Sequence, residues 1–120
     1  GVKQKSKPYP YRNGFEAKVA NHLGSDWEYE SMKLSYVVPA RRASYTPDFI
    51  DHATKTIIEA KGFLRAEDRK KMVLIKEQNP DWTFVLLFQK PTTTISKASK
   101  TTYAMWAEKN GFSWRELPKN

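Results

Sequence analysis

Two short stretches, residues 45–50 (YTPDFI) and residues 56–61 (TIIEAK), decide how this chain folds. Both have the β-branched and aromatic composition of strands, and the residues between them (DHATK) are polar and turn-like, so a β-hairpin is predicted. Side chains alternate along a strand, so Glu59 and Lys61 are predicted to project from the same face. Charged groups inside an apolar strand are costly to bury unless they pair or bind a cation. The hairpin is therefore the first place to look for a functional site.

The residue types on this hairpin predict a metal-dependent nuclease site. Asp48 and Glu59, on adjacent strands, can converge on a hard divalent cation such as Mg²⁺, which prefers oxygen ligands. Lys61 can then reach the same scissile phosphate. The alternative is that Glu59 and Lys61 form an ion pair on an exposed strand and have no chemical role. Pro47 before Asp48, Gly62 after Lys61 and the basicity of the chain favour the nuclease interpretation.

Composition limits the class of protein. At 120 residues the chain is expected to form one domain, and its net charge of +8 favours a polyanionic partner, with nucleic acid as the leading candidate. The absence of cysteine excludes disulfides and thiolate metal sites and suits a reducing cytoplasm. No membrane-spanning stretch and no signal peptide are recognised, so no membrane partner is expected.

The chain is expected to consist of a basic N-terminal arm, residues 1–12, and a single nuclease domain, residues 13–120. The arm carries Lys3, Lys5 and Lys7 between prolines that oppose regular structure. It is predicted to order on a phosphate backbone, and the alternative is a frayed, solubilising terminus.

The first predicted helix spans residues 13–24, with Asn13 as its N-cap and Gly24 as its stop. On periodicity alone, Glu16 is an ordinary first-turn glutamate favoured by the helix dipole. Short strands are predicted at residues 27–29 and 34–38, and residues 39–44 are predicted to interrupt the chain before the hairpin.

After the hairpin come a helix at residues 65–78, an apolar central strand at 82–88, a polar loop at 91–100 and a short helix ending at residue 110. This order predicts an α/β (α+β) fold with a mixed central β-sheet flanked by helices. The basic residues predicted to bind DNA are Lys3, Lys5, Lys7, Arg12, Arg41, Arg42, Arg65, Arg69, Lys70, Lys71, Lys97 and Lys100.

Six segments occur in the order and spacing of one known family. They are FEAKV (15–19), VVPA (37–40), YTPDF (45–49), EAKG (59–62), DRKK (68–71) and EKNG (108–111). Through them the chain resembles, over about residues 12–114, the endonuclease I family of T-odd bacteriophages. These are Holliday-junction resolvases of the PD-(D/E)xK nuclease superfamily.

The resemblance implies a restriction-endonuclease-like core and an intertwined, domain-swapped homodimer with a β-bridge around residues 38–43. It implies metal ligands at Asp48, Glu59 and the backbone carbonyl of Ala60, with Lys61 as the catalytic lysine. Glu16 is expected to come from the partner chain and to complete the second metal site. The cofactor implied is Mg²⁺ or Mn²⁺, two ions per site, with no small-molecule cofactor.

The function that follows is metal-dependent hydrolysis of branched DNA, in the cytoplasm of an infected bacterial cell. Branch selectivity is expected to come from backbone and shape, because no recognition-helix motif appears. Two alternatives stay open: a nuclease of the same superfamily acting on another DNA substrate, and a non-catalytic basic nucleic-acid-binding protein.

Overall fold

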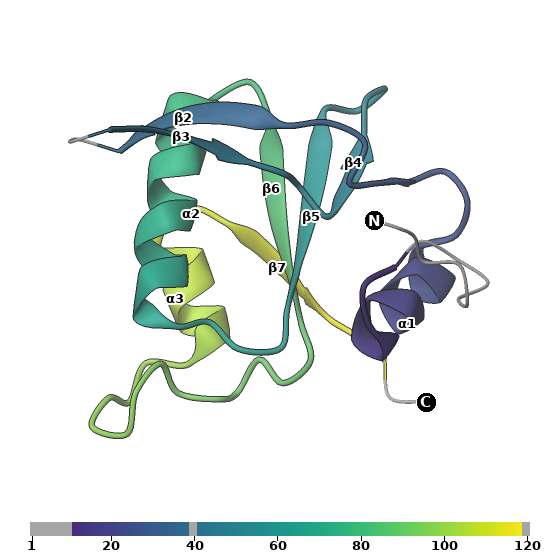
Figure 1. Ribbon diagram of the computed structural model, residues 1–120. Coiled ribbons are helices and arrows are strands. Elements are labelled where there is room, and N and C mark those ends of the chain that lie inside the picture. Colours follow the sequence, from purple (N-terminus) through teal and green to yellow (C-terminus); the bar gives the residue numbers. More distant parts are fainter. Residues whose placement is uncertain (1–10, 39–40, 119–120) are drawn as a thin grey trace.

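The structure is a computed structural model that describes residues 11–38 and 41–118. Its helices are α1 (Gly14–Leu23), α2 (Ala66–Gln78) and α3 (Tyr103–Lys109), and its strands are β1 (Glu28–Tyr29), β2 (Leu34–Val38), β3 (Arg41–Tyr45), β4 (Phe49–Asp51), β5 (Thr56–Lys61), β6 (Thr83–Phe88) and β7 (Ser113–Glu116). A five-stranded sheet has the order β1-β4-β5-β6-β7, and β2 and β3 form a separate two-stranded sheet (Figure 1). The predicted α/β class with a mixed central sheet is confirmed, because β4 pairs antiparallel to β5 while β5, β6 and β7 run parallel.

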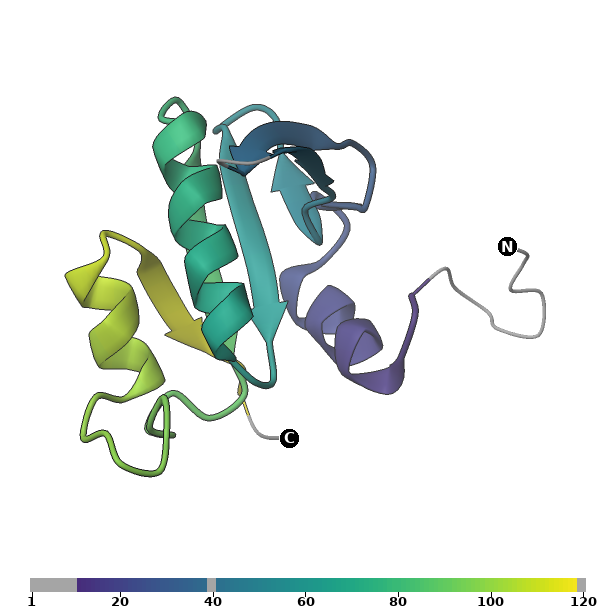
Figure 2. The same cartoon turned by 60° about the vertical axis from the view of Figure 1, so that its left-hand side comes forward.

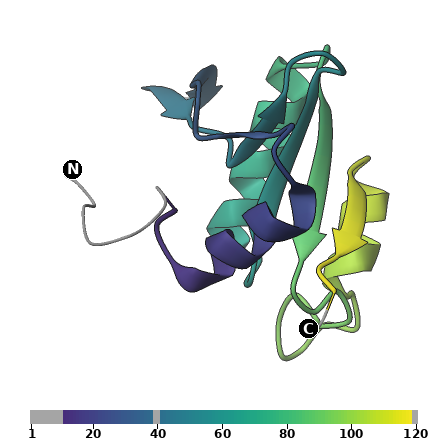
Figure 3. The same ribbon diagram turned by 90° about the vertical axis from the view of Figure 1, so that its right-hand side faces the viewer.

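Two apolar clusters cover the two faces of the large sheet. On one face α2, α3 and the small sheet pack over Ile57, Leu86 and Phe88. On the other face α1 packs through Val19 over Phe49 and neighbouring apolar side chains. The turned views show this arrangement, with α1 on the opposite side of the sheet from α2 (Figures 2 and 3). Parallel strands joined by right-handed crossovers in one direction place their helices on one face, which explains why α2 and α3 lie together.

The predicted limits of α1 are confirmed by its caps. The Asn13 side chain accepts a hydrogen bond from the backbone N–H of Glu16 at 2.9 Å, and Gly24 ends α1 with a φ of +88°, a conformation that favours glycine. Thr102 caps α3 through the N–H of Met105 at 3.1 Å. None of the helices in the described part of the chain has the length and apolarity to span a lipid bilayer.

The predicted interruption at residues 39–44 is wrong for its described part. Residues 41–45 form β3, which pairs antiparallel with β2, so Tyr45 belongs to the small sheet and not to the hairpin. The hairpin itself consists of β4 and β5, with Asp48 directly before β4. The polar sequence of Arg41 and Arg42 concealed the strand because both side chains are exposed. Strand β7 was not predicted either, since Trp114 is the one apolar residue within it.

Strand β5 is a central strand of the large sheet, between β4 and β6. Ile58 is buried in the cluster beneath α1, and Ala60 packs against that cluster, so Glu59 and Lys61 project from the opposite face, as predicted. Glu59 retains 8% exposure. The exposed strand of the alternative interpretation is therefore wrong, whereas its ion pair is present, with Nζ of Lys61 3.7 Å from Oε2 of Glu59.

Candidate active site

The predicted carboxylates meet where the start of β4 lies beside the end of β5. Oδ2 of Asp48 accepts a hydrogen bond from the backbone N–H of Ala60 at 3.0 Å. The backbone N–H of Asp48 in turn lowers the pKa of Glu59. The bond from Ala60 fixes the Asp48 carboxylate relative to the backbone of β5, next to Glu59.

Helix α1 brings a further carboxylate to the other side of Asp48. Oxygen atoms of Glu16, Glu30 and Asp48 all lie within 4.8 Å of one another, and Glu59 is not part of that group among the described residues. The Tyr29 hydroxyl donates a hydrogen bond to Glu16, and the backbone N–H of Arg12 donates to it at 3.1 Å. Glu16 is thus more than a first-turn glutamate. Asp48 is close to both Glu59 and Glu16.

Glu30 lies in this cluster, although nothing in the amino-acid sequence predicted that it would. Its φ of +47° is a left-handed conformation that non-glycine residues rarely adopt. Its backbone N–H donates to the carbonyl of Asp48 at 2.9 Å, and its carboxylate lies 3.1 Å from Nε of Arg12. Strain of this kind collects at functional sites, where surrounding contacts hold it.

The acidic cluster carries more negative charge than its surroundings compensate. Burial, followed by repulsion from Glu59, raises the pKa of Asp48 to about 8. Burial also raises the pKa of Glu59, although Lys61 and the hydroxyl of Tyr45 oppose that rise. Buried oxygen donors with excess negative charge are the environment that a hard divalent cation stabilises. The residues present therefore fit a metal site.

Lys61 is held between two acidic side chains. Its Nζ lies 3.7 Å from Oε2 of Glu59 and 3.5 Å from Oδ1 of Asp68. Oδ2 of Asp68 also accepts from the backbone N–H of Arg65 at 3.0 Å, which caps α2. Asp68 thus connects the start of α2 to the predicted catalytic lysine. The sequence placed Asp68 within the predicted helix at residues 65–78 and gave no indication of this contact.

The cations predicted to bind DNA fall into several environments. Arg69, half-buried, donates from Nη1 to the backbone carbonyls of Leu64 at 2.8 Å and Ile95 at 3.4 Å, so it joins two loops. Arg12 pairs with Glu30. Arg12 is nevertheless exposed, and the other exposed members of the predicted set are Arg41, Arg42, Arg65, Lys70, Lys71, Lys97 and Lys100. Lys3, Lys5 and Lys7 lie outside the described residues.

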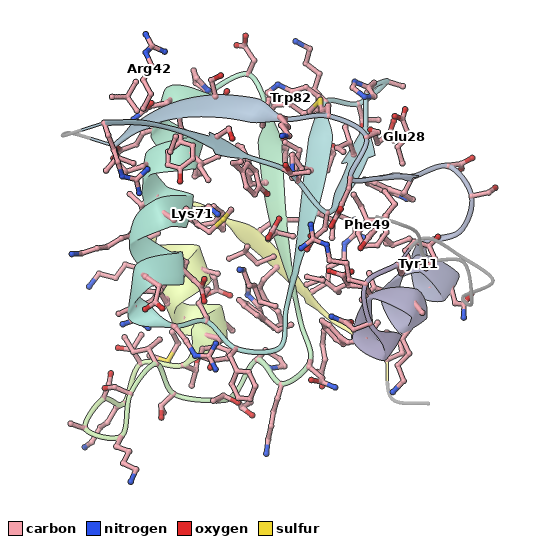
Figure 4. The ribbon with its side chains drawn as sticks, in the orientation of Figure 1. Tyr11, Glu28, Arg42, Phe49, Lys71 and Trp82 are labelled. Atoms are coloured by element: carbon pink, nitrogen blue, oxygen red, sulfur yellow. The ribbon has the colours of Figure 1, made fainter. Side chains whose placement is uncertain are left out.

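A groove of about 1060 Å³ runs between the small sheet and α2. Four of the predicted cations line it: Arg41 from β3, and Arg69, Lys70 and Lys71 from α2. Figure 4 shows Lys71 on the side of α2 that faces the sheet and Arg42 extending away from the molecule. Asp68, the partner of Lys61, lines the same groove. Asp68 therefore belongs both to the lining of the groove and to the ion pair with Lys61.

Comparisons with known proteins agree with the geometry. The family described as Phage endonuclease I matches residues 1–117. "Endonuclease I" of Escherichia phage T7 is 37% identical over 119 residues, which cover 97% of this chain and 79% of that protein. "Endodeoxyribonuclease 1" of Enterobacteria phage T3 is 38% identical over 104 residues, covering 84% of this chain and 68% of that protein.

Proposed function

This chain belongs to the phage endonuclease I family and is an endodeoxyribonuclease, and we propose that it resolves four-way DNA junctions by metal-dependent phosphodiester hydrolysis. The observation that carries the chemistry is the buried acidic cluster. The Asp48 carboxylate is close to Glu59 on one side and to Glu16 on the other, and Lys61 contacts Glu59. This arrangement suits two cations and one scissile phosphate.

Each residue of the cluster has a role in the proposed reaction. Asp48, Glu59 and the carbonyl of Ala60 would hold one Mg²⁺ or Mn²⁺, and Glu16 would complete the shell of a second. When bound, such ions lower the pKa of a water molecule and neutralise the phosphate oxygens. Lys61 would orient the attacking water or offset charge that develops on the phosphate. Its contacts with Glu59 and Asp68 hold the ammonium group at this position.

The groove between the small sheet and α2 supports a DNA-strand path to the cluster. Arg41, Lys70 and Lys71 are exposed cations along it, and cations of this kind bind phosphates without reading bases. Selectivity for a branch would then come from two such grooves held at a fixed angle in a homodimer. A restriction-endonuclease-like core and the host cytoplasm as the working compartment are part of the same proposal.

We further propose that residues 11–38 are exchanged between two copies of the chain. Strand β2 pairs with β3 so that Val38 lies opposite Arg41. Between them are Pro39 and Ala40, which lie outside the described residues and within the predicted β-bridge. Two-residue hairpin loops favour a positive φ at their first position, whereas proline is restricted to a φ near −65°. The sequence of this connection therefore disfavours a tight turn and favours an extended link to a second copy.

Exchange would preserve the contacts that α1, β1 and β2 make in the structure. The Gln78 side chain of α2, for example, donates to the carbonyl of Val37 at 2.8 Å and accepts from its N–H at 2.5 Å. In an exchanged dimer the same contacts form between chains, and each site takes Glu16 from one copy and Asp48, Glu59 and Lys61 from the other.

Cleavage of a labelled four-way junction, compared with a linear duplex of the same arm sequence, tests the substrate. We expect paired cuts in the junction with Mg²⁺ and no turnover in excess EDTA. Equal cleavage of the linear duplex would identify a nuclease of another specificity. Junction binding without cleavage under any divalent cation would identify a binding protein.

Heterodimers test the exchange. A Glu16→Ala chain and a Lys61→Ala chain, each inactive alone, are co-expressed with different tags and the mixed dimer is isolated. With exchange, one site carries both lesions and the other is intact, so nicking of one strand returns without paired cuts. With self-contained sites each site carries one lesion, and the verified heterodimer stays inactive.

A further inference from the structure

Tyr45 is a buried tyrosine whose hydroxyl is directed at the acidic cluster. It ends β3 with 3% exposure, and its O–H donates to Oε1 of Glu59 at 2.5 Å. The other oxygen of that carboxylate, Oε2, lies 3.7 Å from Nζ of Lys61. The two oxygens of Glu59 therefore have different partners, one a neutral phenol and the other the predicted catalytic cation.

We propose that Tyr45 is a positioning residue that holds Glu59 with Oε2 turned toward the metal site. This inference rests on the proposed function and adds a residue that orients one member of the ligand set implied by the family resemblance. Carboxylate ligands are commonly oriented by a hydrogen-bond donor behind them, and loss of such a donor typically weakens metal binding about 10- to 100-fold.

The surroundings make Tyr45 suited to this role. Its backbone pairs with Leu34 across the small sheet, and Nζ of Lys71 lies over its ring, 5.6 Å from the centroid. These contacts leave the phenol little freedom, so its hydroxyl is a fixed donor. In contrast, a glutamate side chain has several rotatable bonds and needs such a donor to keep one orientation.

Tyr45 also lies on the segment that supplies Asp48. Residues 45–48 present the Tyr45 hydroxyl to Glu59 and the Asp48 carboxylate to the N–H of Ala60. One short segment thereby attaches to β5 through two hydrogen bonds at the acidic cluster. Tyr45 belongs to the same segment as Asp48, so an exchange of residues 11–38 would leave the Tyr45–Glu59 contact within one chain.

The test is the variant Tyr45→Phe, which keeps the ring and removes the hydroxyl. The matched control is Tyr103→Phe, a buried tyrosine of α3 with 5% exposure that packs on Phe88 with ring centroids 5.5 Å apart. Mn²⁺ affinity is measured on the DNA-free protein by calorimetry and by electron paramagnetic resonance. We expect the Mn²⁺ dissociation constant of Tyr45→Phe to rise about 10- to 100-fold, and that of Tyr103→Phe to stay at the wild-type value.

Cleavage gives a second measurement. For Tyr45→Phe, the Mg²⁺ concentration for half-maximal junction cleavage should rise by a similar factor, while junction affinity in EDTA is unchanged and the rate recovers at high Mg²⁺. Wild-type Mn²⁺ affinity in Tyr45→Phe, with affinity lost in Glu59→Gln, would overturn the inference and leave the proposed function intact. Absence of Mn²⁺ binding by the wild-type protein would remove the metal site and overturn both.

Discussion

Replacing Asp48 by asparagine should make the metal-free protein more stable while it abolishes metal binding. Asn has nearly the same shape as Asp, and its carbonyl oxygen can still accept the hydrogen bond that Ala60 N–H donates at 3.0 Å. Its NH₂ group can donate to a neighbouring carboxylate. The substitution therefore removes a buried negative charge beside Glu59 and Glu16 without breaking the backbone contact.

The magnitude follows from the pKa of Asp48, which burial and repulsion raise from 3.8 to about 8. A shift of about 4 units corresponds to about 5–6 kcal/mol at about 1.4 kcal/mol per unit. Glu59 remains buried in the variant and shares the repulsion, so we expect about half of this, about 2–3 kcal/mol. For a domain of this size, each kcal/mol moves Tm by about 4 °C, which gives a rise of about 8–12 °C.

The stabilisation expected for Asp48→Asn depends on pH. A carboxyl group with a raised pKa in the folded state destabilises that state only where it would be ionised in the unfolded chain. The Tm difference between Asp48→Asn and wild type should therefore be small near pH 4 and grow as the pH rises toward about 8. Wild-type stability in EDTA should fall over the same range.

Thermal unfolding in EDTA, followed by circular dichroism at fixed protein concentration, measures this difference. Added Mg²⁺ should raise Tm of the wild type, because it binds the folded state, and leave Tm of Asp48→Asn unchanged. The reasoning would be refuted if Asp48→Asn were equal to or less stable than the wild type in EDTA across pH 5 to 8.

Four further variants separate binding from chemistry. Lys61→Ala should abolish junction cleavage and leave junction affinity unchanged in gel-shift assays, since affinity comes mainly from phosphate contacts. Asp68→Asn should slow cleavage at saturating junction with unchanged affinity, because it removes the 3.5 Å ion pair that holds Lys61; an unchanged rate would contradict that role. Lys70→Ala should lower the slope of log affinity against log salt by about 0.9 without lowering Tm. Arg69→Ala should lower Tm as well, because its guanidinium joins two loops, and equal melting of the two variants would show that this contact contributes nothing.

The elements that the sequence predicted correctly are those with local signals. The Asn13 cap and the Gly24 stop set the limits of α1, and the apolar run at residues 82–88 identified the buried central strand β6, observed at Thr83–Phe88. Strand β3 escaped prediction because Arg41 and Arg42 make it look like a loop, and pairing with β2 is a tertiary effect. Local sequence carries little information about such pairing.

The site was predictable to a similar degree. Asp48, Glu59 and Lys61 could be predicted as candidate site residues because acids and a base inside strand sequence have few structural explanations. Glu30 and Tyr45 could not, because the first reaches Asp48 through an unusual backbone conformation and the second through packing of one sheet on the other. A residue that orients another is recognised by its proximity in three dimensions. Neither the periodicity nor the composition of the sequence predicts that proximity.

The carboxylates of the proposed site come from two segments of the chain, so its chemistry would depend on dimer assembly. Glu16 and Glu30 precede Pro39, whereas Asp48, Glu59 and Lys61 follow it. If residues 11–38 exchange as proposed, no single chain holds a complete set of carboxylates, and hydrolysis requires two copies. Each dimer then holds two complete sites related by a two-fold axis, one for each strand to be cut at a four-way junction. A separated chain could bind DNA through its cations but would lack the partner glutamates, so cutting would be restricted to the assembly that can cut twice.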